Sequence, residues 1–112
     1  MAWAIFHFSG SKKESMYYDN GQIKRTGTQL NSLNEGTWTW YYRNGEVQMQ
    51  GSFHNGNREG DWNRFDSLGR MLSISHYENN RMNGKYIEFR NDGSISEEHI
   101  YQNDSIIEKV KY

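Results

Sequence analysis

Glycine recurs through this 112-residue chain at a fixed spacing of 24 residues, and this period constrains the fold more than any other feature. Two glycine series share the spacing: Gly36, Gly60 and Gly84, and then Gly21, Gly45, Gly69 and Gly93. A fixed period of about 20 to 50 residues is typical of repeat architectures, in which each unit packs only on its neighbours. We therefore expect a chain of structurally equivalent units.

Aromatic and aliphatic residues follow the same period. The four columns are Trp38, Trp62 and Tyr86; Tyr17, Tyr41, Phe65 and Phe89; Phe53, Tyr77 and Tyr101; and Ile23, Val47, Met71 and Ile95. An asparagine ends each unit, at positions 31, 55, 79 and 103. We predict a single domain over 1–112 with four repeats, at 12–35, 36–59, 60–83 and 84–107. Segments 1–11 and 108–112 then form the N-terminal and C-terminal caps, the first of them as an extra strand.

Each unit is expected to form two β-strands. In the second unit the strands run over 36–42 and 46–53, with turns at Asn44-Gly45 and Asn55-Gly56. Asn-Gly favours the positive φ angles of a type I′ hairpin turn. The chain contains no proline, which would interrupt a ladder of backbone hydrogen bonds. The predicted fold is all-β: a single-layer antiparallel meander of tandem 24-residue hairpins with no substantial helix.

The turn fixes the strand register and therefore the two faces of the sheet. With Asn44 and Gly45 at the centre of the turn, Tyr42 lies opposite Val47, and Trp38 lies opposite Gly51, which leaves room for the indole. Side-chain alternation then predicts one face carrying Trp38, Trp40, Tyr42, Val47, Met49 and Phe53. The other face is expected to carry Tyr41, Phe65 and Phe89.

Composition limits the classes of function. Only 34% of residues are hydrophobic, but 15% are aromatic, which indicates a folded chain with an aromatic core rather than a disordered one. The net charge of −1 lacks the basic excess of nucleic-acid-binding proteins and of modules that bind anionic membranes. There is no cysteine and no apolar run of signal-peptide or transmembrane length. We expect a cytoplasmic protein.

The repeat unit resembles the MORN repeat, with the pattern Gly-x-Trp-x-x-Tyr-x-x-x-Gly, an aliphatic residue, and then Tyr or Phe followed by x-Asn-Gly. The residues that carry it are Gly36, Trp38, Tyr41, Gly45, Phe53, Asn55 and Gly56, and their counterparts in the next two units. The pattern is most similar to the variant repeat of the bacterial YwqK-like antitoxin family. That resemblance implies a protein that neutralises a partner toxin by binding it. The second strands have few glycines, which argues against the lipid-binding roles of eukaryotic MORN proteins.

Residues that could carry chemistry are scattered. The four histidines, His7, His54, His76 and His99, fall in different columns and are interpreted as surface imidazoles. Glu88 and Glu97 are expected to face each other, as two catalytic carboxylates would, but Arg64 and Arg90 lie in neighbouring columns and neutralise them in this interpretation. We predict no catalytic residue, no cofactor and no metal site.

A binding patch is predicted at positions where the repeat pattern does not call for an aromatic residue but the second unit has one. The columns of Trp40 and Tyr42 become charged in later units, and exposed aromatics and arginines are typical of binding hot spots. The predicted partner-binding residues are Trp40, Tyr42, Arg43, Arg64, Asp66, Glu88 and Arg90. The alternative interpretation is a locally richer core in the second unit.

The predicted function is a non-catalytic module that binds a protein, either a toxin or another effector. The main alternative is a structural or scaffold protein, which associates with itself through an open sheet edge or is phage-encoded and binds a host protein. Lipid binding is disfavoured by the balanced charge. Carbohydrate binding is a further alternative, since exposed Trp and Tyr rings stack on sugars.

Overall fold

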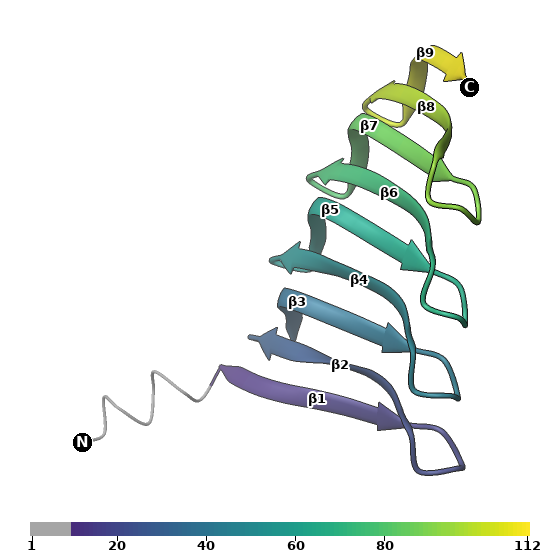
Figure 1. Cartoon of the computed structure of the whole chain (residues 1–112). Coiled ribbons are helices and arrows are strands. Elements are labelled where there is room, and N and C mark those ends of the chain that lie inside the picture. The colour runs from purple at the N-terminus through teal and green to yellow at the C-terminus, as the bar shows by residue number, and fades with distance from the viewer. Residues whose placement is uncertain (1–9) are drawn as a thin grey trace.

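The computed structural model describes residues 10–112, which form one nine-stranded antiparallel sheet (Figure 1). Each strand pairs only with its neighbours in sequence. The strands are β1 (Ser11–Tyr17), β2 (Ile23–Leu30), β3 (Leu33–Tyr41), β4 (Val47–His54), β5 (Asn57–Phe65), β6 (Met71–Glu78), β7 (Arg81–Phe89), β8 (Ile95–Gln102) and β9 (Ser105–Lys111). The all-β meander is confirmed, and residues 10–112 include no helix that could span a membrane. Of the N-terminal capping strand expected over 1–11, residues 1–9 lie outside the described residues, and Ser11 is the first residue of β1.

The strands begin earlier than the repeat frame predicts. Strand β3 starts at Leu33, three residues before Gly36, and β5 and β7 start at equivalent positions. Gly36 lies inside β3 with a φ of 72°, at an irregularity where Thr26 pairs with Thr39 but Thr28 pairs with Glu35. The leading glycine is therefore a bulge residue rather than a strand start, because only glycine adopts this φ without steric cost.

Two kinds of turn alternate along the sheet. At one edge, tight turns join β2 to β3, β4 to β5 and so on, and both central residues have positive φ, for example Asn55 at 50° and Gly56 at 81°. That is the type I′ geometry. At the other edge the loops are larger (Figure 1).

The larger loops correct the prediction at Asn44-Gly45. Only the glycine has positive φ there, at 91°. The N–H of Gly45 donates to the carbonyl of Tyr42 at 3.0 Å, and the N–H of Tyr42 donates to the carbonyl of Glu46 at 2.8 Å. These bonds define a three-residue loop that ends in a glycine bulge, not a type I′ turn.

The bulge changes the register by one residue at the strand ends. Tyr41, not Tyr42, pairs with Val47, whereas Trp40 pairs with Met49 and Trp38 with Gly51 as predicted. Val47 consequently lies beside Phe65, on the face opposite the tryptophans. The predicted face is correct for Trp38, Trp40, Met49 and Phe53, and wrong for Val47, while Tyr42 lies just past the end of β3, in the larger loop.

The core consists of indole rings that lie on glycines of the preceding unit. Trp38 and Trp62 are only 3% and 5% exposed. A Cβ added at Gly51 would lie 2.1 Å from Cδ2 of Trp62, so the ring that uses this space is Trp62 and not Trp38. Trp38 occupies the equivalent place over Gly27. The indole Nε1–H groups donate to backbone carbonyls of Thr28 and Ser52.

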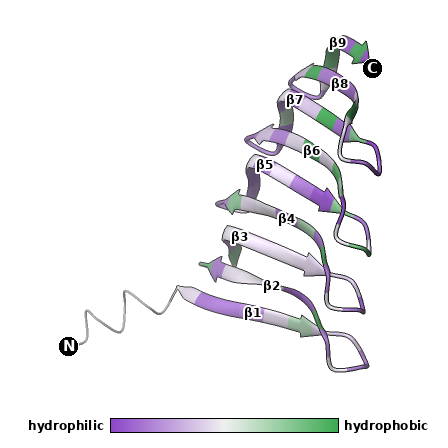
Figure 2. Cartoon of the chain, in the orientation of Figure 1, coloured by the Kyte–Doolittle hydropathy of each residue, from purple (hydrophilic) through white to green (hydrophobic). Residues whose placement is uncertain are grey.

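The next unit keeps this packing with smaller partners. Ser75 occupies the position of Gly51 and pairs with Tyr86, which replaces the tryptophan. The smaller ring of Tyr86 therefore packs on Ser75, which is larger than the glycine of the earlier units. Because the sheet is a single layer, hydrophobic residues form short patches along the strands rather than one continuous layer (Figure 2).

We predict that Gly51→Ala destabilises the fold by about 1–3 kcal/mol, because the added methyl group collides with the Trp62 indole. Guanidinium unfolding monitored by tryptophan fluorescence measures the change. The control is Ser75→Ala. Ser75 occupies the position of Gly51 in the next unit and already has a Cβ, so this change should destabilise the fold less than Gly51→Ala. Equal free energies of unfolding for wild type and Gly51→Ala would contradict this packing.

Candidate protein-binding face

The face that carries Trp38, Trp40 and Trp62, here called the tryptophan face, presents a continuous row of paired residues across the strands. The row runs through Arg25, Trp40, Met49, Arg64, Ser73, Glu88 and Glu97, on β2 to β8. Three predicted partner-binding residues, Trp40, Arg64 and Glu88, are therefore aligned on alternate strands, about 10 Å apart.

The central part of this face contains an open cavity of about 200 Å³, here called the Trp40 cavity. Its lining residues are Trp40, Met49, Phe53, Arg58, Trp62, Arg64, Ser75 and Tyr77. Trp40 lies 5.6 Å from Trp62, and Phe53 meets Trp62 edge-on at 5.0 Å between ring centroids. These contacts hold the aromatic floor in one arrangement. Phe53 and Tyr77 were not singled out as binding residues from the sequence, because they occupy a regular aromatic column. Met49 and Arg58 were missed because their columns hold mixed residue types and give no signal.

Arginines border the Trp40 cavity. The guanidinium of Arg58 lies 4.3 Å from the ring centroid of Tyr77 and donates to the Tyr77 hydroxyl at 3.1 Å and to Oδ1 of Asn80 at 2.7 Å. Arg64 is exposed, and its guanidinium makes no hydrogen bond or ion pair within residues 10–112. None of the lining residues is acidic.

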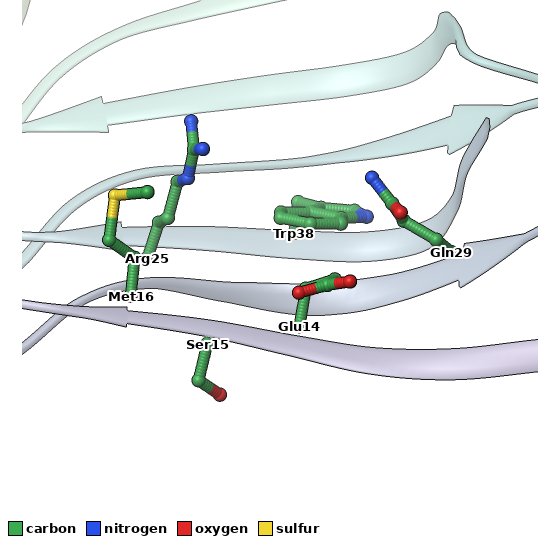
Figure 3. A pocket seen from close by; sticks show the side chains of 6 residues that line it. All are labelled: Glu14, Ser15, Met16, Arg25, Gln29 and Trp38. Carbon is green, nitrogen blue, oxygen red and sulfur yellow. The ribbon is translucent and has the colours of Figure 1, made fainter. Parts of the chain in front are cut away.

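A second, smaller cavity of about 90 Å³ lies on the same face beside β1 (Figure 3). Glu14 stands next to Trp38 there, in the column where later units have tryptophan or tyrosine. Met16, Arg25 and Gln29 project from the same side of the sheet, whereas Ser15 points away from it. A carboxylate thus separates the Trp40 cavity from the N-terminal edge of the described sheet.

The other four predicted binding residues lie in the larger loops, and two of them, Tyr42 and Arg43, contact a neighbouring unit. The Tyr42 hydroxyl donates to the carbonyl of Phe65 at 2.7 Å. Nη1 of Arg43 lies 2.6 Å from Oδ1 of Asp19, with the guanidinium 5.1 Å from the ring centroid of Tyr18. These side chains connect one unit to the next.

Asp66 and Arg90 have comparable roles in their own loops. Oδ1 of Asp66 accepts the backbone N–H of Arg70 at 2.9 Å and of Leu68 at 3.0 Å, and Oδ2 pairs with the Arg70 guanidinium. The backbone hydrogen bond from Arg70 is the main reason that the pKa of Asp66 is lowered. Arg90 donates to the carbonyls of Ile95 and Tyr112. The predicted patch is therefore divided between the tryptophan face and the loop edge.

Glu88 and Glu97 are direct cross-strand partners, as predicted. Their expected neutralisation by Arg90 is wrong, because that guanidinium is bonded to carbonyls. Glu97 instead contacts Nε2 of His99 at 2.8 Å and Nζ of Lys111 at 3.7 Å, and the hydrogen bond from His99 is the main cause of a lowered pKa at Glu97. Burial, and next the Glu88 carboxylate, raise the pKa of Tyr86.

The histidines are separate from one another. His54 pairs with Glu35 and His76 with Asp61, each on an exposed part of the sheet. His99 is only 8% exposed, so the interpretation of all four as surface imidazoles is wrong for this residue. His7 lies outside the described residues. Residues 10–112 contain no group of three or more His, Cys, Asp or Glu side chains placed to hold a metal ion.

Comparison with known families finds a similar repeat. The model of the MORN repeat variant matches residues 11–31 and 34–55, which span β1–β2 and β3–β4. These matches support the MORN-repeat superfamily and a repeat-based binding module. Among curated proteins, none matches the chain. The hairpins beyond residue 55 continue the same strand pairing and turn geometry.

We predict that Tyr42→Phe lowers the free energy of unfolding by about 1 kcal/mol, because the carbonyl of Phe65 loses its hydroxyl donor. Urea unfolding compares this variant with Tyr17→Phe, which alters an exposed tyrosine. Tyr42→Phe is expected to bind a partner with the same affinity as the wild type. A Tyr42→Phe protein with wild-type stability and weakened binding would reverse these assignments.

We also predict that Asp66→Asn reduces the loss of stability in acid. The pKa of Asp66 in the folded protein is below its ordinary value of 3.8. At a pH between these two pKa values, the unfolded chain therefore binds the proton more readily than the folded protein does. Asp66 therefore stabilises the fold above about pH 4, and this contribution is lost as the pH falls through the folded pKa. Unfolding curves from roughly pH 5 to pH 2 measure the difference.

The control for this experiment is Glu108→Gln, whose carboxylate has no hydrogen bond or ion pair within residues 10–112 and whose replacement should leave the acid limb unchanged. An acid limb for Asp66→Asn that superimposes on the wild-type curve would show that the loop carboxylate does not contribute.

Proposed function

From its MORN-type repeats and its uncovered tryptophan face, we propose that the chain is a non-catalytic module of antitoxin or immunity type, which neutralises a protein partner by direct binding. The observation that carries this proposal is the Trp40 cavity, where an aromatic floor lies beside the exposed Arg64 and the half-buried Arg58 on one face. Buried aromatics bordered by arginine are the usual composition of protein-binding hot spots.

The rigidity of the sheet favours tight binding. Every strand from β2 to β8 is hydrogen-bonded on both sides, and the larger loops are joined by Tyr42, Asn44 and their equivalents in the first unit. A surface that is already ordered loses little conformational entropy when a partner binds, so more of the contact energy appears as affinity.

The shape of the Trp40 cavity favours a macromolecule over a small substrate. At about 200 Å³ and open to solvent, it is smaller than the pockets of roughly 300–1,000 Å³ that enclose small ligands. The carboxylate pair of Glu88 and Glu97 lies on the same open face, with Glu97 already paired to His99 and Lys111. We place the module in the cytoplasm, with neither nucleic acid nor membrane as its partner.

A self-associating scaffold is the second candidate. Within residues 10–112, strand β9 is paired on one side only, by β8. It exposes Ile106, Ile107 and Val110 at 48%, 60% and 39%. Unpaired strands with exposed apolar residues are templates for pairing with another chain.

We predict that a stoichiometric protein partner is captured from native lysate by the wild type and lost with Trp40→Ala/Arg64→Ala. Each of the two substitutions is expected to weaken the affinity about tenfold or more, as substitutions of hot-spot residues do. Mass spectrometry identifies the partner, and titration calorimetry with the purified partner measures its dissociation constant. Circular dichroism first establishes that the variant is folded.

The single variant Arg64→Ala guards against a folding defect, since the Arg64 side chain is exposed and its guanidinium makes no hydrogen bond or ion pair within residues 10–112. Arg81→Ala, an exposed arginine on β7 outside the cavity, is the matched control and should retain the partner. Absence of any partner, together with a concentration-dependent dimer in light scattering, would reject the antitoxin proposal and favour the scaffold.

A further inference from the structure

Positive charge is concentrated around the Trp40 cavity of a chain whose net charge is −1. Arg58 and Arg64 line the cavity, and Arg25 pairs with Trp40 across the adjacent strand. Arg25 and Arg64 are both exposed, and none of the three guanidiniums forms an ion pair within residues 10–112. Elsewhere in the described sheet, Arg43 and Arg70 are paired with carboxylates.

We propose that the Trp40 cavity binds a protein segment in which a large apolar side chain is flanked by one or two carboxylates. This inference rests on the proposed function of the tryptophan face as a protein-binding surface, and it specifies the chemistry of the partner. The apolar side chain enters the cavity, and the carboxylates pair with the guanidiniums at its border.

The cavity floor supports the apolar part of this inference. Trp40 and Trp62 lie 5.6 Å apart, and Tyr77 closes the far side at 6.1 Å from Trp62. Met49 completes the lining with a flexible thioether side chain, which adapts to apolar groups of different shape. An aliphatic or aromatic side chain that covers these rings removes apolar surface from water on both partners.

The spacing of the arginines supports the acidic part. In the cross-strand row, Arg25 is one strand from Trp40 and Arg64 is two strands from it on the other side, which corresponds to about 5 and 10 Å. A residue inserted beside Trp40 thus has a guanidinium on each side. Guanidinium groups bind carboxylates through two parallel hydrogen bonds, which fixes orientation as well as charge.

The cationic region is short, and this favours a peptide over a nucleic acid. Glu14 lies on the tryptophan face beyond Arg25, and Glu88 lies in the row two strands beyond Arg64. The stretch between Arg25 and Arg64 therefore spans three strand spacings, about 15 Å. A long polyanion would meet the ion pair of Glu14 with Lys12 at one end and the Glu88 carboxylate at the other, whereas a short acidic segment fits between them.

Titration with synthetic peptides tests this inference without the native partner. The probes are the capped pentapeptides Gly-Glu-Leu-Glu-Gly and Gly-Lys-Leu-Lys-Gly, and oligothymidylate as a polyanion with flat bases. Proton–nitrogen correlation spectra follow the indole N–H signals of the four tryptophans. We expect the glutamate peptide to shift the signals of Trp40 and Trp62 saturably, and to bind about tenfold or more tightly than the lysine peptide.

Arg25→Gln/Arg64→Gln should remove this preference between the two peptides, and Arg81→Gln should retain it. Equal binding of both peptides, no saturable shift with the glutamate peptide, or tighter binding of oligothymidylate would each overturn the inference. A glutamate preference without any protein captured from lysate would support this chemistry and count against the proposed function. A captured partner without a peptide preference would overturn this inference alone.

Discussion

The packing of an indole ring on a glycine of the preceding unit is the interaction on which the rest of the structure depends. A single-layer sheet has no second layer to cover it, so it must bury apolar surface within its own face. Trp38 over Gly27 and Trp62 over Gly51 achieve this, and each ring also donates a hydrogen bond to a neighbouring backbone carbonyl. In the next unit Ser75 replaces the glycine and Tyr86 replaces the tryptophan, so a larger residue beneath is matched by a smaller ring above.

This packing leaves the tryptophan face only partly covered. Trp38 and Trp62 fill the space above the glycines, whereas Trp40 lies against none of the described glycines and is only half-buried, beside Met49 and Arg64. The larger loops use a separate set of residues, among them Tyr42, which contacts the next unit, and Asp66, which holds its own loop. The loop contacts and the proposed binding residues Trp40 and Arg64 are therefore at different positions, which allows one set to vary without loss of the other.

The fold was largely predictable because its determinants are local and periodic. Asparagine and glycine turns, the absence of proline and the 24-residue columns indicate strand, turn, strand, and the register of Trp38 with Gly51 followed from counting. The candidate site was predicted only in part. Trp40, Arg64 and Glu88 do align, but Tyr42 and Asp66 lie past the ends of their strands and make contacts in the larger loops, whose hydrogen bonding the spacing along the chain does not specify.

The sequence by itself determined the number of units, the all-β meander and which aromatic residues form the repeat core, since these depend on spacing along the chain. Only the tertiary structure decided which ring covers which glycine, which carboxylates are paired, and that Arg58 and Tyr77 share a cavity with Trp40. Those relations depend on the stacking of one hairpin on the next, where side chains separated by one or more strands come within a few ångströms. A period in the sequence specifies that neighbours exist, and the twist and bulges of the sheet specify which side chains meet.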